Sequence, residues 1–409
     1  MMEHEKHKSR FDFLIYLLLA AQIASLGILN RFVFLGRPIT AYIRYMVFFV
    51  SLINLGLYVF EDRSKKAIGA WFLCSFIIVG IIGFANTGDL MNVLIEASHY
   101  VTIIALFFYI ERHEYSTNTI LLSIYILIPI LMITSLLSSF GFLNGMRDAS
   151  GGLLRNSADV DGTIGVVATL TVFHEINRKE KVRLWDYCEL IMGALVVFFS
   201  LSRGRIAILL ICILIYLLIT IRSRKVSIIK KMIPIIILLL ILLVVFSNVI
   251  GGLIDQIISR FMSTDIEETN VTYRQYEISY HLSIYKSNVL FGYGWGMLTK
   301  FPIRDHCSYS AVLAYMGTIG GVPYLCWFFW MLFTSLYNSF KENCVNNYHL
   351  TFIILLAVMT LAIANMAFNK TGGVWGVFIA YTAMLDRSNS SVNKEMEENK
   401  KIGCKYIKN

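Results

Sequence analysis

Apolar runs about twenty residues long recur along the whole chain and are separated by short polar segments. A helix of that length crosses a hydrocarbon core of roughly 30 Å. We therefore predict an all-α polytopic membrane protein in which residues 1–386 form one membrane domain. The twelve predicted spans are residues 11–29, 40–60, 67–86, 93–110, 119–140, 161–176, 185–201, 206–221, 232–250, 309–337, 350–368 and 372–386. The remaining long segment between spans is residues 251–308, which we expect to contain short helices.

Composition supports the membrane class. Of the 409 residues, 57% are hydrophobic and 15% are charged, whereas soluble domains carry about 25% charged residues. The seven cysteines form no CxxC pair, which argues against a disulfide framework or a zinc site. No Walker loop or dinucleotide fingerprint is present. We expect no cofactor and no metal.

The distribution of basic residues predicts the orientation. With both termini in the cytoplasm, the segments on that side carry 23 Lys and Arg residues and the outer segments carry 12. The positive-inside rule then puts residues 251–308 on the outer side. It also accounts for the net charge of +9 without nucleic acid. Residues 387–409 are charged, lack an apolar face and are predicted to be a disordered cytoplasmic tail.

Several polar residues fall in the outer parts of predicted spans. A charge at the bilayer centre costs at least roughly 2.5–3.5 kcal/mol, so their shared depth indicates a polar cavity beneath the long loop. Glu96 and His99 are three residues apart and share a helix face. For any single residue, snorkelling to the interface is the simpler explanation, and we expect His174 to reach the cytoplasmic headgroups. The outer group comprises Arg44, Glu96, His99, Asp159, Asp161 and Asn365.

The turn SRGR, residues 202–205, joins two predicted spans on the outer side. Arg203 and Arg205 are unexpected there, because basic residues are disfavoured outside. A guanidinium group offers paired donors to phosphate, which suggests a phosphate clamp. Anchoring to lipid headgroups explains the motif equally well.

The long loop carries further candidates. Tyr273, Tyr276, Tyr280 and Ile284 form a stripe at helical spacing, which we interpret as a packing face. Arg274 lies on another side of the same predicted helix, with Glu277 and His281 nearby.

GYGWG, residues 292–296, permits a sharp backbone path. We expect Tyr293 and Trp295 to anchor at the interface or to stack on a sugar. His306 follows, flanked by Asp305. A histidine here suits a general base near neutral pH, although an exposed loop histidine is the ordinary alternative. The glycines and the proline of the next span, in GTIGGVP, predict a helix that bends.

The order of these motifs resembles the O-antigen ligase and Wzy-type polysaccharide polymerase superfamily over residues 190–330. The shared features are a helix ending in SRGR, an arginine about seventy residues later, a GxGxG element, and an outer histidine before a helix with GxxGG. In this chain Cys307 stands between His306 and Ser308, where the family pattern more often has Asn or Ser directly after the histidine.

The resemblance implies a metal-independent membrane glycosyltransferase of the GT-C type that uses polyprenyl-diphosphate-linked sugars. By this resemblance, Arg203 and Arg274 bind the diphosphate, Arg205 is a further candidate, and His306 activates the acceptor hydroxyl. It also implies membrane lipids, a chain-length regulator and a flippase as partners.

Three functions remain open from the sequence. A polymerase would extend a lipid-linked repeat unit, and a ligase would move a finished glycan to a different acceptor. A secondary transporter or flippase fits twelve spans and the Glu96/His99 pair. Against it, the intramembrane polar residues favour one side instead of the midplane.

Overall fold

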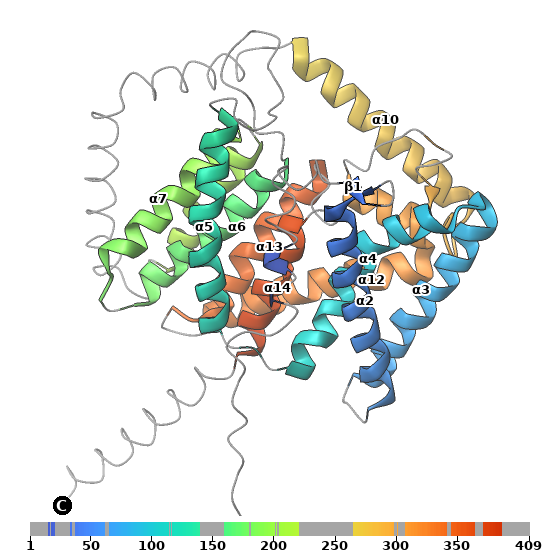
Figure 1. Ribbon diagram of the computed structural model, residues 1–409, viewed down its shortest axis with the longest axis horizontal. Helices are drawn as coiled ribbons and strands as arrows, with labels where there is room; N and C mark the ends of the chain where they lie inside the picture. Colours follow the sequence, from blue (N-terminus) through green and yellow to red (C-terminus); the bar gives the residue numbers. More distant parts are fainter. Residues whose placement is uncertain are drawn as a thin grey trace, which may run out of the picture.

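The computed structural model describes a bundle of helices (Figure 1). The residues that it describes are 15–16, 18–20, 33–34, 37–61, 65–113, 115, 117–139, 159–179, 181–200, 202, 204–220, 265–297, 301, 307–341, 345–364 and 371–386.

Within these residues, every helix except α10 overlaps a predicted span, and α10 lies inside the predicted loop 251–308. They are α2 (Ile39–Phe60), α3 (Lys66–Thr87), α4 (Leu90–His113), α5 (Thr117–Ser139), α6 (Asp159–Arg178), α7 (Leu184–Phe199), α10 (Asp265–Ser287), α12 (Ser308–Lys341), α13 (Asn347–Ala364) and α14 (Thr371–Leu385). A further apolar helix covers Gly204–Thr220. Before α2, the two-residue strands β1 (Val33–Phe34) and β2 (Arg37–Pro38) form a short antiparallel hairpin that the hydropathy pattern did not indicate.

The membrane class is confirmed, since α3, α4, α12 and residues Thr117–Leu136 of α5 are long and apolar enough to cross a bilayer. The predicted span 232–250 and most of the predicted span 11–29 lie outside the described residues. The number of twelve spans therefore stays a prediction.

The helices pack in two groups that meet at α13 and α14. On one side α5, α6 and α7 pack on one another, and on the other α2, α3 and α4 do so. α14 contacts both α4 and α6, while α12 packs against α3 and α13 (Figure 1). The shared core is dense in aromatic rings, such as Phe107 stacked on Trp327 with centroids 5.3 Å apart.

Helices that follow one another along the chain alternate in direction, so their termini gather at two ends of the bundle. We call the end where α3 begins and α4 finishes the basic end, because it carries Lys65, Lys66, Lys179 and Lys181. We call the end where α3 finishes and both α4 and α12 begin the loop end. Lys65 marks the basic end: it contacts Glu111 near the end of α4 and Tyr381 near the end of α14.

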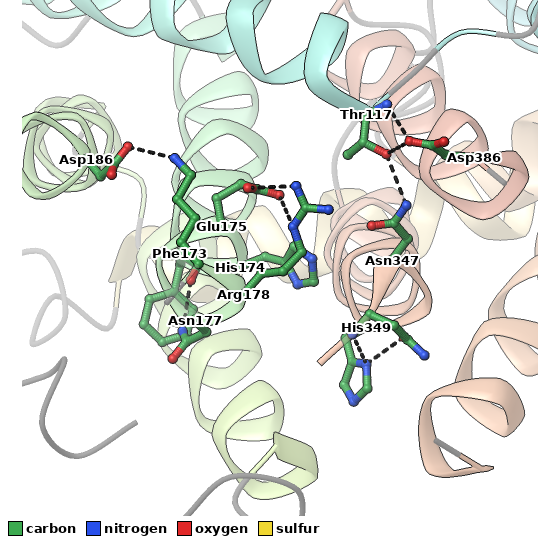
Figure 2. Close-up of polar contacts among 12 residues, drawn as sticks. Thr117, Phe173, His174, Glu175, Asn177, Arg178, Asp186, Asn347, His349 and Asp386 are labelled. Carbon is green, nitrogen blue, oxygen red and sulfur yellow. Dashed lines mark hydrogen bonds and ion pairs between the residues drawn. The ribbon is translucent and has the colours of Figure 1, made fainter. Parts of the chain in front are cut away.

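A buried polar network ties the basic end together (Figure 2). The start of α5 is fixed by Thr117, whose backbone N–H donates to Asp386 at 2.7 Å. The Asn347 amide donates to the Thr117 hydroxyl at 3.0 Å, which adds α13. His174 lies fully buried and bonds the Tyr216 hydroxyl at 2.9 Å. The expectation that His174 reaches the headgroups is therefore wrong, because the side chain is buried between helices and one ring nitrogen bonds Tyr216.

The turn between α6 and α7 is part of the same network. Lys179 donates to Asp186 at 3.0 Å and to the Tyr125 hydroxyl at 3.1 Å. Tyr125 in turn donates to Asp186 at 2.6 Å. At the end of α6, Arg178 pairs with the buried Glu175. Some of the basic residues that indicated sidedness in the sequence thus also hold α5, α6 and α7 together.

Candidate functional site

The loop end is built around a break in α12. Gly317 has φ 60° and ψ −159° inside an otherwise helical segment. In an unbroken helix the N–H groups of Thr318 and Ile319 would donate to the carbonyls four residues earlier, those of Ala314 and Tyr315. The break leaves all four groups in need of partners, as at any helix end. It also confirms the bend expected in this helix.

The segment that contains GYGWG supplies those partners. Thr318 N–H donates to the Val289 carbonyl at 2.7 Å, and Ile319 N–H donates to the Leu290 carbonyl at 3.0 Å. In the opposite direction, Tyr293 N–H donates to the Ala314 carbonyl at 2.8 Å, and Gly294 N–H to the Tyr315 carbonyl at 3.0 Å. Non-helical backbone survives at membrane depth when protein satisfies its polar groups, and these four bonds do so.

Glycine is required in GYGWG and at the break in α12 both by the backbone conformation and by the close approach of neighbouring backbone. Gly292, Gly294 and Gly317 all have positive φ. A Cβ on Gly294 would lie 2.1 Å from the backbone nitrogen of Gly83 in α3. A Cβ on Gly292 would lie 2.5 Å from the Tyr315 backbone. The segment is therefore held between α3 and the broken part of α12, where a side chain cannot enter.

Glu96 completes the attachment from α4. One carboxylate oxygen accepts the backbone N–H of Gly296 at 2.6 Å and that of Met297 at 3.0 Å. The carboxylate is buried and makes charge-assisted hydrogen bonds. Glu96 thus anchors the inserted segment, a role that its pairing with His99 in the sequence did not suggest. His99 itself is half-buried.

Trp295 lies in the core, where we expected interface anchoring or sugar stacking. It is 1% exposed and stacks on Tyr100 with ring centroids 5.7 Å apart. Tyr315 packs on the same ring at 5.6 Å. Tyr293 is half-buried and contacts the Phe301 ring. Between the two aromatic residues of GYGWG, Tyr293 is thus the more accessible at the loop end.

The helix α10 runs along the outside of the bundle and packs on α12 (Figure 1). Its inward face consists of Glu277, His281 and Ile284, all buried. Tyr273 and Tyr276 are exposed, so the prediction that the tyrosine stripe forms the packing face is wrong for its first half. The polar face turns inward because α12 offers it hydrogen-bonding partners. Arg274 is half-buried one turn before Glu277.

One hydrogen-bond chain fixes α10 to the start of α12. The Ser310 hydroxyl donates to the Cys307 carbonyl at 3.1 Å, so its oxygen accepts from His281 Nδ1 at 3.0 Å. Burial lowers the pKa of His281 to about 4, because the charged ring would lose its hydration. Cys307, whose carbonyl accepts the Ser310 hydroxyl, directly follows His306 in the sequence.

Arg205 lies at the beginning of the helix Gly204–Thr220. It is 2% exposed, and its Nε donates to the Thr163 hydroxyl of α6 at 3.3 Å. Gly162 makes room for it, since a Cβ at that position would lie 2.6 Å from Arg205 Cδ. Arg205 is thus held between α6 and the end of α7.

Other candidates fall outside what the structure describes. Arg203 and His306 lie outside the described residues, and the side chains of Arg44 and Asp161 are not described. The expected convergence of Arg203, Arg274 and His306 therefore stays a prediction. Among the described residues, no group of three His, Cys, Asp or Glu side chains is arranged to hold a metal ion.

An apolar groove of about 410 Å³ opens between α2, α3 and α4 beside the inserted segment. Trp295 forms part of its wall, with Phe84 and Leu90 toward the loop end and Phe48 and Val101 further along the helices. A chain of hydrocarbon fits such a groove, because its lining offers almost no polar atoms.

Sequence reasoning missed the anchoring role of Glu96 and the docking role of His281. One signal was present for each. Glu96 is a carboxylate in an apolar helix of a chain that also has a glycine-rich segment in need of acceptors. His281 lies on the same helix face as Glu277, an arrangement typical of a buried polar contact.

Residues 190–312 match the family model described as O-antigen ligase. A search of curated proteins found no match. The matched segment runs from α7 through the helix Gly204–Thr220, α10 and GYGWG to the first turn of α12. The match confirms the resemblance, and this part of the chain is related to the O-antigen ligase and Wzy-type polymerase superfamily.

Proposed function

We propose that the protein is a polysaccharide polymerase in the cytoplasmic membrane of a bacterium. It transfers a polyprenyl-diphosphate-linked glycan onto a lipid-linked repeat unit at the outer face, with both chain termini in the cytoplasm. The observation that carries the proposal is the O-antigen ligase match over residues 190–312, because that segment contains Arg203, Arg205, Arg274 and His306.

The described geometry supports a site at the loop end. α10, which carries Arg274, is fixed through His281 and Ser310 to the turn that follows His306. Arg205 is held in place from α6. Both attachments limit the movement of the elements that carry the candidate residues, and positioned groups are what a transfer reaction needs.

In the proposed reaction, a hydroxyl of the acceptor sugar attacks the anomeric carbon of the donor. The bond between that carbon and the diphosphate oxygen breaks as the new glycosidic bond forms. His306 takes the hydroxyl proton. Arg203 and Arg274, with Arg205, stabilise the charge that develops on the leaving polyprenyl diphosphate. The apolar groove between α2, α3 and α4 accommodates part of the polyprenyl chain.

The test uses the purified full chain in liposomes with lipid-linked repeat units as both donor and acceptor. We expect a ladder of products with increasing repeat number. His306→Ala and Arg274→Ala should each reduce chain growth at least 100-fold, in the range seen for loss of an acid–base or charge-stabilising group. Lys286→Ala is the matched control, because Lys286 is an exposed cation on the same α10 helix.

Each alternative predicts a different product. Transfer only to a second kind of acceptor lipid would identify a ligase. Movement of the intact lipid-linked unit across the bilayer, without any new glycosidic bond, would identify a transporter. Polymer of normal length from the His306 and Arg274 variants would contradict the site assignment.

A further inference from the structure

A second groove, of about 650 Å³, runs along the outside of the bundle between α3 and α12 in its basic half. Its walls are almost entirely apolar or aromatic. Ile68, Trp71 and Phe72 line it from α3, and Pro323, Trp327 and Trp330 line it from α12. Trp71 Nε1 donates to the Ile319 carbonyl at 3.1 Å and so holds its ring across the gap. None of these residues belongs to the candidate transfer site.

The groove carries positive charge at one end. Lys65 Nζ lies 5.5 Å from the Trp327 ring centroid and 5.8 Å from that of Trp330. It bonds Glu111 and the Tyr381 hydroxyl, which occupies two of the three N–H groups of an ammonium. Lys66 is exposed beside it. Glu111 offsets the charge of Lys65, so among the described residues the exposed Lys66 adds positive charge next to this end of the groove.

The length of the groove fits within one leaflet. The eight residues from Lys65 to Phe72 span about 10 Å along a helix, and half of a hydrocarbon core measures about 15 Å. Trp71 and Trp330 are 52% and 46% exposed, so the walls are open to lipid. With α3 and α12 crossing a bilayer, we expect the cationic end at the headgroup level of the leaflet at the basic end, with the apolar walls along the acyl chains.

We propose that this groove binds an anionic phospholipid, with an acyl chain between α3 and α12 and the phosphate at Lys65 and Lys66. Basic pockets between membrane helices recognise anionic headgroups in this way. A polyprenyl-linked donor is the less suitable occupant, because Arg205 and α10 lie at the opposite, loop end. The proposal does not depend on the transfer activity.

Tryptophan quenching tests it. The full chain is reconstituted in phosphatidylcholine vesicles that contain equal fractions of either brominated phosphatidylglycerol or brominated phosphatidylcholine. We expect stronger quenching by brominated phosphatidylglycerol, and we expect Trp71→Phe with Trp330→Phe to remove that difference. Lys66→Gln should weaken the apparent phosphatidylglycerol affinity about fivefold, which corresponds to about 1 kcal/mol for a lysine near an anionic headgroup. Lys65→Gln should weaken it further.

Lys181→Gln is the matched control, because Lys181 is exposed at the basic end between α6 and α7, away from the groove. It should leave the affinity unchanged. Lys66→Gln removes no described contact within the protein, so we expect it to leave the fold intact. A loss of affinity in this variant would therefore report on lipid binding and not on folding. Equal quenching by the two lipids, or equal losses in the Lys66 and Lys181 variants, would overturn the proposal. If polyprenyl phosphate competed with phosphatidylglycerol in the wild type but not in the Lys65→Gln variant, the groove would bind polyprenyl phosphate, and the proposal of a phospholipid would be overturned.

Discussion

At the scale of single residues, a helical glycine is required where the backbone of another segment lies too close to admit a Cβ. Gly83 in α3 lies against the Trp295 backbone, where an added Cβ would be 2.1 Å from the carbonyl oxygen. Gly56 in α2 has no atom within 4 Å of the same position. Both are helical, so the contact is what distinguishes them.

Gly83→Ala should therefore destabilise the protein by roughly 1–3 kcal/mol, since the Cβ must displace backbone in a packed region. Gly56→Ala should be neutral or stabilising by up to about 1 kcal/mol, because alanine is the better helix former. Thermal unfolding in detergent, followed by tryptophan fluorescence, measures both. Equal stability of the two variants would contradict the tight contact between α3 and GYGWG.

Glu96 gives a second prediction at this scale. Glu96→Ala leaves the buried N–H groups of Gly296 and Met297 without their acceptor, at a cost of about 1–3 kcal/mol for each group. Glu96→Gln keeps a carbonyl oxygen as acceptor and should therefore lose less stability than Glu96→Ala. Unfolding curves of the two variants against wild type measure the difference. If Gln and Ala were equally unstable, the negative charge would matter more than the acceptor, and a role in a polar cavity would regain support.

At the scale of elements, the break in α12 and the docking of α10 form one unit. α12 loses two helical hydrogen bonds at Gly317 and gains four with residues 289–294. α10 leads directly into that segment and is joined to α12 by His281 and by the Tyr285–Thr318 hydroxyl contact at 2.9 Å. Movement of α10 should therefore be transmitted to the start of α12.

Acidification should release α10. The folded-state pKa of His281 is about 4, below the ordinary value of 6.5, so the unfolded state binds the proton more readily. The stabilisation from the neutral ring is complete above pH 6.5 and is lost as the pH falls toward 4, by roughly 3 kcal/mol at most. Hydrogen exchange of α10 at pH 7 and pH 5 measures the change. His281→Gln should flatten the pH dependence, and an unaltered profile would exclude His281 as its source.

At the scale of the whole molecule, the bundle has a basic end and a loop end, and the orientation in the membrane is a testable prediction. The basic residues predict that the end with Lys65 and Lys181 faces the cytoplasm. In a cysteine-free background, Tyr276→Cys on the exposed face of α10 should react with an impermeant maleimide in intact spheroplasts. Lys181→Cys should react only after the membrane is opened. The reverse pattern would invert the orientation and move the candidate site to the cytoplasmic face.

Hydropathy along the chain was enough to assign the protein to the membrane class and to locate most of the described helices. The hydrophobic effect acts on each apolar run separately, so α2 to α7 and α12 to α14 could be located without knowledge of their neighbours. The bend at Gly317 was also readable, because glycine and proline act locally on the backbone. The relation to O-antigen ligases followed from motif order, which needs no contacts.

Which polar groups meet depends on the packing of helices that are distant in the sequence. Glu96 and Gly296 are separated by 200 residues, and no local pattern predicts that one will anchor the other. The same applies to His281 with Ser310 and to Trp295, whose burial depends on Tyr100 and Tyr315. A buried polar group must find a partner, but the choice among distant partners is made by how the helices pack.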